Sequence, residues 1–272
     1  MRLKVATWNI NSVRLRSGLV SQFLADHAPD VLCLQETKCQ DDQFPSAVFR
    51  KAGYEHIAIH GQKGYHGVAV VSRFPFEGRD AKIFCGKADA RHISITLTRE
   101  AGDAAGVSIH NFYVPAGGDI PDAALNEKFA HKLAFLDEMR DWCGTDKPGG
   151  GRAILVGDLN IAPLETDVWS HKQLLDVVSH TPIECEKLGI VQGEGRWVDA
   201  VRMHRPEPEK VFTWWSYRAQ DWQASNRGRR LDHVWSSENL LPAFAGYNIL
   251  RDARGWERPS DHVPVVARFD LD

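Results

Sequence analysis

The sequence has 272 residues, 43% of them hydrophobic and 25% charged, and its 33 Lys plus Arg against 36 Asp plus Glu give a net charge of −3. This composition is typical of globular proteins and excludes a disordered, collagen-like or disulfide-framed chain. No apolar run approaches the roughly 20 residues that a membrane-spanning helix needs. The charged first residues, Met1 to Val5, do not resemble a signal peptide. Because the net charge is close to neutral, a polyanion would have to bind to a local basic patch.

The five cysteines are odd in number and contain no C-x-x-C pair, so neither a disulfide scaffold nor a zinc ribbon is expected. The 12 histidines contain no H-E-x-x-H motif, which disfavours a histidine-ligated zinc site. This cysteine usage favours a reducing compartment. We therefore expect a cytoplasmic protein with no membrane partner. We also expect a monomer, because no oligomerisation segment is evident.

In the first half of the chain, strand-like segments alternate with a helix-like one. Residues 17–28 carry apolar side chains at helical spacing, with Ser17 as the expected cap and Pro29 as the stop. Residues 93–97 alternate apolar and polar, which is typical of a half-buried strand. The other strand-like segments of this half are 3–8, 31–34, 67–72 and 107–114.

The clearest helix is predicted over residues 122–142, with Gly144 just beyond its end. Its apolar face consists of Leu125, Phe129, Leu133, Leu136 and Met139. Residues 165–190 look mainly helical or irregular. The strands predicted in this half are 153–156, 211–215, 230–236, 243–249 and 263–269. No linker or repeat divides the chain, so we predict one α/β domain over residues 1–272, with two packed, mostly antiparallel sheets and outer helices.

Acids and amides lie at the ends of five predicted strands. They are Asn9 with Asn11, Gln35 with Glu36, Asp158 with Asn160, Asp232, and Asp261 with His262. Each has an ordinary interpretation by itself, as a turn residue or an exposed acid. Their joint occurrence at strand ends instead favours one shared site, because sheet scaffolds assemble sites in this way. Carboxylate and amide oxygens suit a hard cation such as Mg²⁺ better than zinc.

Seven segments in this order carry a family resemblance: Thr7–Asn11, Leu34–Lys38, Asn111–Pro115, Gly157–Pro163, Thr213–Trp215, Arg230–Asp232 and Ser260–His262. With them the chain resembles the exonuclease III and AP (apurinic/apyrimidinic) endonuclease branch of the endonuclease/exonuclease/phosphatase superfamily. The resemblance implies a four-layered α/β sandwich, in agreement with the element pattern. It also implies a Mg²⁺-dependent phosphodiesterase, with Mn²⁺ as a substitute. The implied substrate is duplex DNA, cut 5′ of abasic sites and trimmed of nucleotides or blocking groups at 3′ ends.

For the metal site, the resemblance implies that Glu36 is the principal ligand and that Asn9 and Asp261 lie beside the ion. Whether Asp261 binds the ion directly varies with the metal state. Asn11 departs from relatives that carry an acid near that position, which weakens the case for a strong second metal site. The resemblance leaves Asn11 as a substrate-binding residue.

For the chemistry, the resemblance implies that Asp158 activates or orients the attacking water and that Asn160 helps to position it. It implies that His262 contacts the scissile phosphate and is held by Asp232, whose charge raises the imidazole pKa and favours the donating cation. Tyr113 would donate to the phosphate or assist the leaving group. A metal-bound hydroxide remains an alternative to Asp158 as the base.

For substrate selection, the resemblance points to an apolar pocket at Trp214 and Leu231 that accepts a baseless deoxyribose. The ordinary alternative is that Trp214 and Trp215 both lie in the core. The cluster Arg227, Arg229 and Arg230 is expected to bind DNA phosphates, with Arg229 as the specific candidate. Basic residues near the first two motifs, including Arg16 and Lys38, are expected to do the same.

Two other functions remain open at this point. The first is a phosphohydrolase on the same scaffold that acts on RNA, a phosphorylated small molecule or a lipid, with the tryptophans in the core. The second is a DNA-binding module without chemistry, which is disfavoured because every residue type that catalysis needs is present. A serine hydrolase is disfavoured because no G-x-S-x-G motif occurs.

Overall fold

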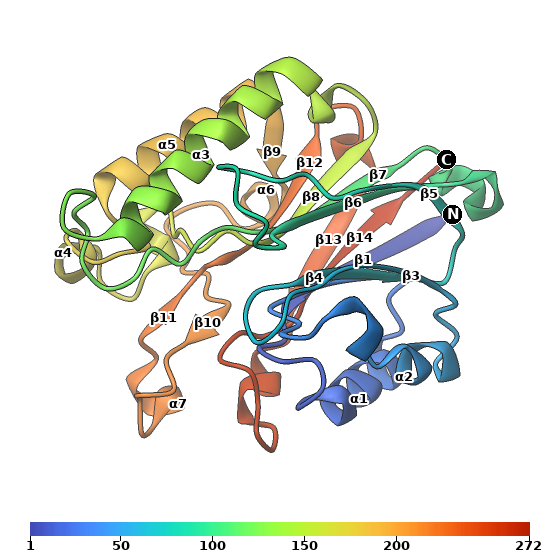
Figure 1. Ribbon diagram of the computed structural model, residues 1–272, viewed down its shortest axis with the longest axis horizontal. Helices are drawn as coiled ribbons and strands as arrows, with labels where there is room; N and C mark the ends of the chain where they lie inside the picture. Colours follow the sequence, from blue (N-terminus) through green and yellow to red (C-terminus); the bar gives the residue numbers. More distant parts are fainter.

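Short runs of aliphatic residues, such as Val31–Gln35 and Ala153–Asp158, form strands that are buried along their whole length. Strands without a polar face must be covered on both sides. In the computed structural model, which describes residues 1–272, two six-stranded sheets pack face to face and helices cover their outer faces (Figure 1). The four-layered α/β sandwich predicted from the sequence is thereby confirmed.

The first sheet has the strand order β13-β14-β1-β2-β4-β3. Its strands are β1 (Arg2–Asn9), β2 (Val31–Gln35), β3 (His56–His60), β4 (Val68–Ser72), β13 (Phe244–Ile249) and β14 (Val265–Asp270). The second sheet has the order β5-β6-β7-β8-β12-β9. Its strands are β5 (Phe76–Asp80), β6 (His92–Leu97), β7 (Ser108–Tyr113), β8 (Ala153–Asp158), β9 (Trp197–Asp199) and β12 (Asp232–Ser237). A separate hairpin pairs β10 (Trp214–Trp215) with β11 (Gly228–Arg229).

Helices α3 and α5 lie on one outer face of the sandwich, and α1 and α2 lie on the other (Figure 1). The helices are α1 (Ser17–His27), α2 (Ser46–Lys51), α3 (Glu127–Asp146), α4 (His171–Leu174), α5 (Pro182–Glu194), α6 (Ala200–His204) and α7 (Trp222–Ser225). None of them combines the length and the apolarity needed to cross a bilayer.

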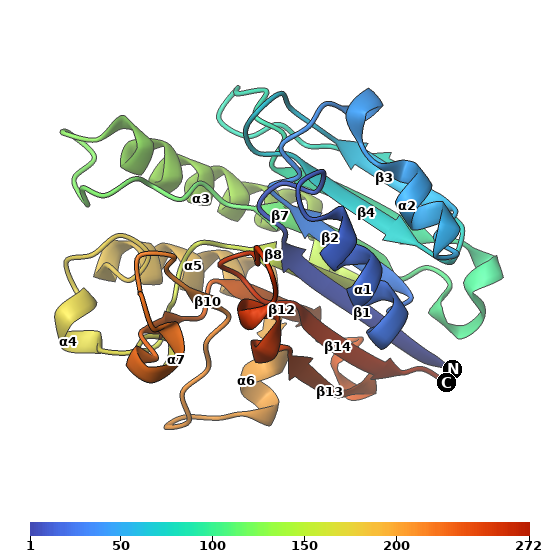
Figure 2. The same ribbon diagram turned by 90° about the horizontal axis from the view of Figure 1, so that it is seen from below.

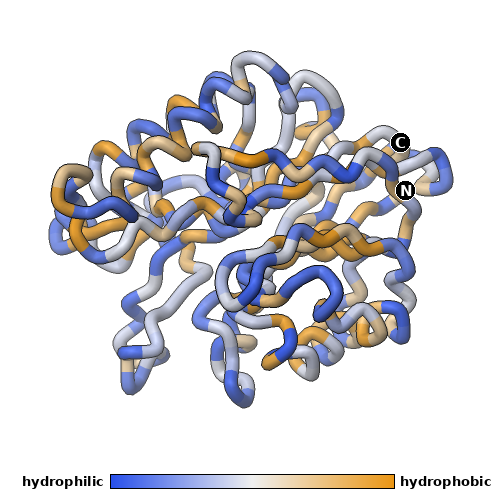
Figure 3. The backbone as a smooth tube through the Cα atoms, viewed as in Figure 1, coloured by the Kyte–Doolittle hydropathy of each residue, from blue (hydrophilic) through white to orange (hydrophobic).

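The largest hydrophobic cluster, of 27 buried residues, includes Val5, Val31, Ile109 and Val156 from facing strands of the two sheets. Two further clusters of 16 buried residues each fill the spaces under α1–α2 and under α3–α5. Figure 3 shows hydrophobic residues along the central strands, whereas the tips of the loops that project below the sandwich are hydrophilic. Burial between layers therefore holds the sheets together, and the projecting loops remain available for contacts with other molecules.

Each sheet is mostly antiparallel but contains one parallel pair, β1 with β2 and β7 with β8. The carboxyl ends of these strands lie at the edge of the sandwich near the β10–β11 hairpin, away from the two chain termini (Figures 1 and 2). Strand β12 runs antiparallel to β8, which sets Asp232 opposite Asp158. Five strand ends that are far apart in the sequence therefore meet at one edge.

Helix α3 differs from the predicted helix over 122–142, because it spans Glu127–Asp146. Asn126 caps its first turn by accepting a hydrogen bond from the Lys128 amide, while Asp122 closes a separate turn with the Ala124 amide. Leu125, predicted for the apolar face, is 76% exposed outside the helix. The turn-forming Asp122 competes with helix formation and so displaces the start.

Three smaller predictions also need correction. Ser17 begins α1 but makes no capping bond, since Arg16 occupies the cap position. Strand β6 is almost fully buried, because the facing sheet covers one side and Trp142 of α3 packs against His92 on the other. Of the predicted strand 211–215, only Trp214–Trp215 pairs as a strand, and the pair belongs to the separate hairpin.

Gly157, the residue before Asp158, has a backbone conformation that only glycine adopts easily, with φ of +141°. A Cβ atom there would lie 1.9 Å from the carbonyl oxygen of Phe112 on the paired strand β7. We expect Gly157→Ala to lower the free energy of unfolding by about 2–4 kcal/mol. Urea denaturation measures this change, and a loss below about 0.5 kcal/mol would show that the strands accommodate the methyl group.

Candidate active site

The end of β2 places Glu36 at the centre of the strand-end cluster, with φ of +50°. Its Oε1 accepts hydrogen bonds from Asn9 Nδ2 and from the Tyr113 hydroxyl, both at 2.9 Å, and its Oε2 lies 2.8 Å from Lys38 Nζ. Burial by itself would raise the pKa of Glu36, but the Lys38 ammonium and the Asn9 amide outweigh it and lower that pKa. Glu36 is therefore ionised at neutral pH.

Asp158 ends β8 and is only 1% exposed. Its Oδ2 accepts from Asn9 Nδ2 at 2.8 Å and from Asn160 Nδ2 at 3.2 Å, and its Oδ1 accepts from the Asn160 amide at 2.9 Å. Burial raises the pKa of Asp158 to about 7, and the nearby His262 limits the rise. Asp158 can therefore exchange a proton near neutral pH, which Glu36 cannot.

His262 stands between two carboxylates. Its Nδ1 lies 2.8 Å from Asp232 Oδ2, and its Nε2 lies 3.6 Å from Asp158 Oδ2. The Thr213 hydroxyl also donates to Asp232 Oδ2, at 2.6 Å. Burial by itself would lower the pKa of His262, but the charges of Asp232 and Asp158 raise it to about 10. The imidazole is therefore a cation at neutral pH, and its Nε2 proton faces the site.

Asp261 is fixed from two sides at the rim of the site. Its Oδ2 accepts from Trp214 Nε1 at 2.9 Å, and its Oδ1 lies 3.3 Å from Asn11 Nδ2. Asn11 in turn accepts from Lys38 Nζ at 2.6 Å through its side-chain oxygen. Hydrogen bonds thus connect Asp261 to Glu36 through Asn11 and Lys38.

The oxygen atoms of Glu36, Asn9 and Asp261 are the kind of ligands that a hard divalent cation takes. Asp158, Asp232 and His262 also lie close enough together to hold a metal. In that second group, however, the His262 Nδ1 atom is hydrogen-bonded to Asp232 Oδ2. The all-oxygen donors of the first group suit a hard divalent cation better than a set that includes an imidazole nitrogen. The donor set around Glu36 therefore fits Mg²⁺, and the group around His262 fits proton transfer and phosphate binding.

A pocket of about 720 Å³ opens beside these residues. Trp214 and Leu231 line it together with apolar residues of the segment around α4, namely Trp169, Leu174, Val177 and Val178. Tyr113, Asn160 and His262 reach its wall from the sheets. Trp215, the neighbour of Trp214, is only 2% exposed and packs in a separate core cluster. Trp214 therefore lies in the predicted pocket, and Trp215 lies in the core, as the alternative interpretation expected.

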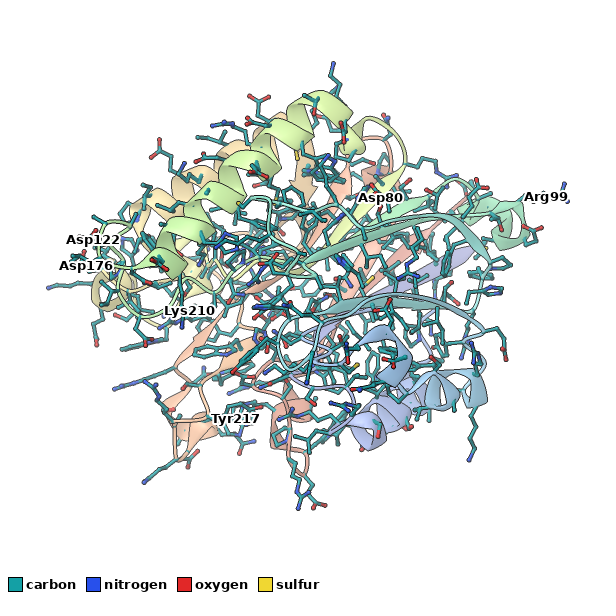
Figure 4. All side chains as sticks on the ribbon, viewed as in Figure 1. Asp80, Arg99, Asp122, Asp176, Lys210 and Tyr217 are labelled. Atoms are coloured by element: carbon teal, nitrogen blue, oxygen red, sulfur yellow. The ribbon has the colours of Figure 1, made fainter.

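The rim of the pocket is basic on the side of the β10–β11 hairpin, where Figure 4 labels Tyr217. Arg218, Arg227 and Arg229 line the pocket, and the guanidinium of Arg229 lies 5.3 Å from the centre of the Trp214 ring. Positive charge is therefore concentrated on this side of the pocket.

Two arginines that were expected to bind phosphates are instead buried in the structure. Arg230 is 1% exposed and forms ion pairs with Asp167, at 2.8 Å, and with Asp199, at 2.6 Å. Arg16 is 8% exposed and donates to the carbonyl oxygens of Ile10 and Arg258. The prediction is wrong for these two residues because their charges are already paired or satisfied inside the protein.

The structure therefore brings together all eight residues predicted for catalysis and metal binding. Trp214, Leu231 and Arg229 line the adjoining pocket, and Asn11 is hydrogen-bonded to Asp261. Sequence reasoning missed the contact of Lys38 with Glu36 and that of Thr213 with Asp232. Lys38 and Thr213 both belong to the motif segments, and this membership could have indicated that they lie at the site. Ser260, whose hydroxyl donates to the Asn9 carbonyl oxygen at 2.7 Å, was also missed.

Comparison with known proteins gives matches along the whole chain. A model of the Endonuclease/Exonuclease/phosphatase family matches residues 6–262. Exodeoxyribonuclease III from Haemophilus influenzae is 28% identical over 285 residues, covering 98% of this chain and 100% of that protein. The structure of an AP endonuclease from Archaeoglobus fulgidus is 31% identical with a TM-score of 0.89, covering 99% of this chain and 100% of that one.

A third match is the structure of the 3′ phosphatase NExo from Neisseria bound to a product DNA hairpin. It is 30% identical with a TM-score of 0.89, covering 99% of this chain and 100% of that one. The resemblance first seen in the seven motif segments is thereby confirmed. The chain belongs to the Endonuclease/Exonuclease/phosphatase family, in its exonuclease III and AP endonuclease branch.

Proposed function

We propose that this protein is a metal-dependent DNA repair nuclease. It hydrolyses the phosphodiester 5′ of an abasic site and removes nucleotides or blocking groups from the 3′ ends of duplex DNA. The observation that carries this proposal is the buried Asp158, which lies 3.6 Å from the His262 imidazole beside the Trp214–Leu231 pocket. The names of the similar proteins, an exodeoxyribonuclease III, an AP endonuclease and a 3′ phosphatase, support both activities.

We assign the metal site to Glu36, Asn9 and Asp261, with Mg²⁺ as the ion and Mn²⁺ as its substitute. When bound there, the ion neutralises charge on the phosphate and stabilises the leaving oxygen. Glu36 contributes an anionic oxygen at neutral pH because Lys38 lowers its pKa. The neighbouring Asn9 amide donates to Glu36 and to Asp158, so it fixes both carboxylates relative to each other.

In the proposed reaction, Asp158 accepts a proton from the attacking water while Asn160 holds the carboxylate in one orientation. The water oxygen forms a bond to phosphorus, and the bond from phosphorus to the 3′ oxygen breaks. The cationic His262 donates to a non-bridging phosphate oxygen, where a charged donor is stronger than a neutral one. Burial raises the pKa of Tyr113 well above its usual value. Its hydroxyl group therefore stays protonated and acts as a hydrogen-bond donor.

The pocket wall of Trp214 and Leu231 favours a deoxyribose without its base. An abasic nucleotide has lost its pairing partner and most of its stacking, so turning it out of the duplex costs less than turning out a normal nucleotide. Arg229, and Asn11 at the rim, would bind the DNA backbone, and Arg227 adds positive charge beside Trp169. The enzyme would thus recognise damage rather than base sequence.

Trp214→Ala should reduce incision at an abasic site by about tenfold to a hundredfold more than it reduces removal of a normal 3′ nucleotide. Because Trp214 also donates to Asp261, Trp214→Phe is the matched control, since it keeps a ring and loses only that hydrogen bond. Steady-state rates on the two substrates measure the ratio. Equal losses on both substrates for Trp214→Ala would assign the residue to packing.

Glu36→Gln should raise the Mg²⁺ concentration for half-maximal activity by about ten- to a hundredfold, because it removes the anionic ligand. A Mg²⁺ titration of the incision rate measures this shift. Glu55→Gln changes an exposed acid and serves as the control. An unchanged titration for Glu36→Gln would remove Glu36 from the ligand set.

We further propose that residues 1–272 act as one catalytic domain, as a monomer, and in the cytoplasm. The continuous core between the sheets and the assembly of the site from both halves of the chain support the first point. Gel filtration with light scattering tests the second, and a mass near twice 30.5 kDa would contradict it.

The competing function is a phosphohydrolase of the same fold that acts on RNA or on a phosphorylated small molecule or lipid. The basic rim beside an apolar pocket favours DNA. The test compares equal concentrations of an abasic duplex, a 3′-phosphate duplex, a single-stranded RNA and a phosphoinositide. The proposal predicts turnover of the two duplexes in preference to the other substrates. Faster turnover of RNA or phosphoinositide by the same preparation would replace the proposal.

A further inference from the structure

A Lys–Glu ion pair lies behind the site, and both of its side chains have no solvent exposure. Lys132 comes from α3 and Glu184 from α5, the two helices of one outer layer. Neither residue lines the pocket. Isolated charges are rarely buried, because removing them from water is costly.

The Lys132 ammonium has three N–H donors and three acceptors around it. It contacts the Glu184 carboxylate, the Asn160 carbonyl oxygen at 2.8 Å and the Ala116 carbonyl oxygen at 3.3 Å. Asn160 is the residue whose amide groups hold Asp158, and its backbone is left-handed, with φ of +54°. Asparagine adopts this conformation more readily than other non-glycine residues, and the Lys132 ammonium holds the carbonyl group of Asn160 in it.

The Glu184 carboxylate reaches a different segment. It accepts hydrogen bonds from the amides of Ser179, at 3.0 Å, and Thr181, at 3.2 Å, and from the Thr181 hydroxyl. The segment that it holds in turn binds the pocket arginine, since Arg229 donates to Val178 O at 3.0 Å and to Ser179 Oγ at 2.7 Å. Glu184 therefore supports the wall on which Arg229 and Trp214 lie.

The backbone at Gly117 also packs closely against the Lys132 side chain. Its φ is +89°, and a Cβ atom there would lie 2.9 Å from Lys132 Cδ. The loop after β7 therefore passes so close to the lysine stem that a side chain would displace it. Backbone carbonyl groups of two loops, at Ala116 and Asn160, therefore contact the ammonium beside the Glu184 carboxylate.

Glu184 closes the capping box at the start of α5 with Thr181, so helix capping accounts for part of its position. Its buried pairing with Lys132 needs a further reason, because well-packed apolar residues in place of a buried ion pair often stabilise a protein as much or more. An ammonium group, however, can bind acceptors from three segments at once. We infer that Lys132 and Glu184 are positioning residues for the reaction. Lys132 fixes Asn160, and through it Asp158, while Glu184 fixes the wall of the substrate pocket. This inference rests on the proposed nuclease function.

The test uses Lys132→Met and the double variant Lys132→Met, Glu184→Gln, assayed on a duplex with one abasic analogue. Lys132→Met should lower kcat by about ten- to a hundredfold, because Asn160 loses its support, with KM changed far less. It should also lower Tm, because Glu184 is left buried and unpaired. The double variant should recover Tm and not kcat, since the donors to Asn160 and Ala116 are still missing. Lys132→Arg should restore part of kcat.

Leu136→Ala is the matched control, since it removes a buried side chain from the same helix and no hydrogen bond to Asn160 or Ala116. It should lower Tm and leave kcat unchanged at temperatures where the protein is folded. Recovery of kcat together with Tm in the double variant, or an equal kcat loss in Leu136→Ala, would overturn the inference. If Lys132→Met does not fold, the comparison of kcat with Tm is made on the double variant and on Glu184→Gln.

Amide hydrogen exchange gives a readout that needs no activity. Peptides that cover residues 158–162 should exchange faster in the double variant than in the wild-type protein, and those of β1 and β2 should not. Unchanged exchange at 158–162 would overturn the inference. A wild-type protein that cuts neither the abasic nor the 3′-phosphate duplex would overturn the proposed function instead, and the exchange result would still stand.

Discussion

Asp158→Asn should lower kcat by about 10³- to 10⁴-fold and leave binding of an abasic duplex close to that of the wild-type protein. The amide keeps the size of the carboxylate and cannot accept the proton of the attacking water. Asp158 itself does not line the pocket, and an amide of the same size leaves Trp214 and Leu231 in place. Single-turnover cleavage in Mg²⁺ and fluorescence anisotropy in EDTA measure the two quantities.

The control for this prediction is Asp141→Asn, which changes a carboxylate on α3 that is 63% exposed. It should cut the abasic duplex at the wild-type rate. A rate within about tenfold of wild type for Asp158→Asn would remove Asp158 from proton transfer. A metal-bound hydroxide would then be the remaining base.

The second large effect is on the pH dependence of cleavage. Asp158 must be ionised to accept a proton, so the wild-type rate should rise as the pH passes through about 7, the pKa to which burial raises this carboxyl. His262 must carry its proton, so the rate should fall as the pH passes through about 10. The result is a bell-shaped profile with a broad maximum on the alkaline side of neutrality.

Asp232→Asn removes the carboxylate that lies 2.8 Å from His262 Nδ1. Without that charge, burial dominates and the pKa of His262 falls, so the alkaline limb should move to lower pH by about one to three units. At pH 9 the variant should lose most of its activity, whereas at pH 7 it should lose much less. An alkaline limb that stays in place in Asp232→Asn would show that another group sets it.

The strands and their polar ends could be predicted because each is marked by a short stretch of consecutive residues. The runs 31–34 and 153–156 are apolar, and Glu36 and Asp158 each follow two residues after such a run. Which ends meet is set by pairing, which the local pattern does not contain. The register that places Asp232 opposite Asp158 is one example, because these residues come from strands far apart in the chain.

Neighbouring residues of the same type have different environments in the structure, and composition and spacing do not predict which of them is buried. Trp214 lines the pocket and Trp215 is buried, because successive residues of a strand point to opposite faces and only packing decides which face is covered. Arg229 reaches the pocket, whereas Arg230 is paired with Asp167. In each case the deciding partner is remote in the sequence.

Lys132 illustrates the same limit in a helix. Lys132 is three residues after Phe129 and four before Leu136, so helical spacing places it on the apolar face, although a lysine is ordinarily exposed. Its ammonium is buried because Glu184 of α5 and two backbone carbonyl groups receive it. Only the packed structure brings these acceptors together.

The measurement that tests the central proposal most directly is cleavage of one end-labelled duplex that carries a single abasic analogue, in Mg²⁺ and in EDTA, beside its intact counterpart. The proposal predicts metal-dependent incision on the 5′ side of the lesion with a 3′ hydroxyl on the upstream product. Slower laddering from the 3′ end would measure the exonuclease share. No incision by folded protein in Mg²⁺, or equal internal cutting of the intact duplex, would contradict it.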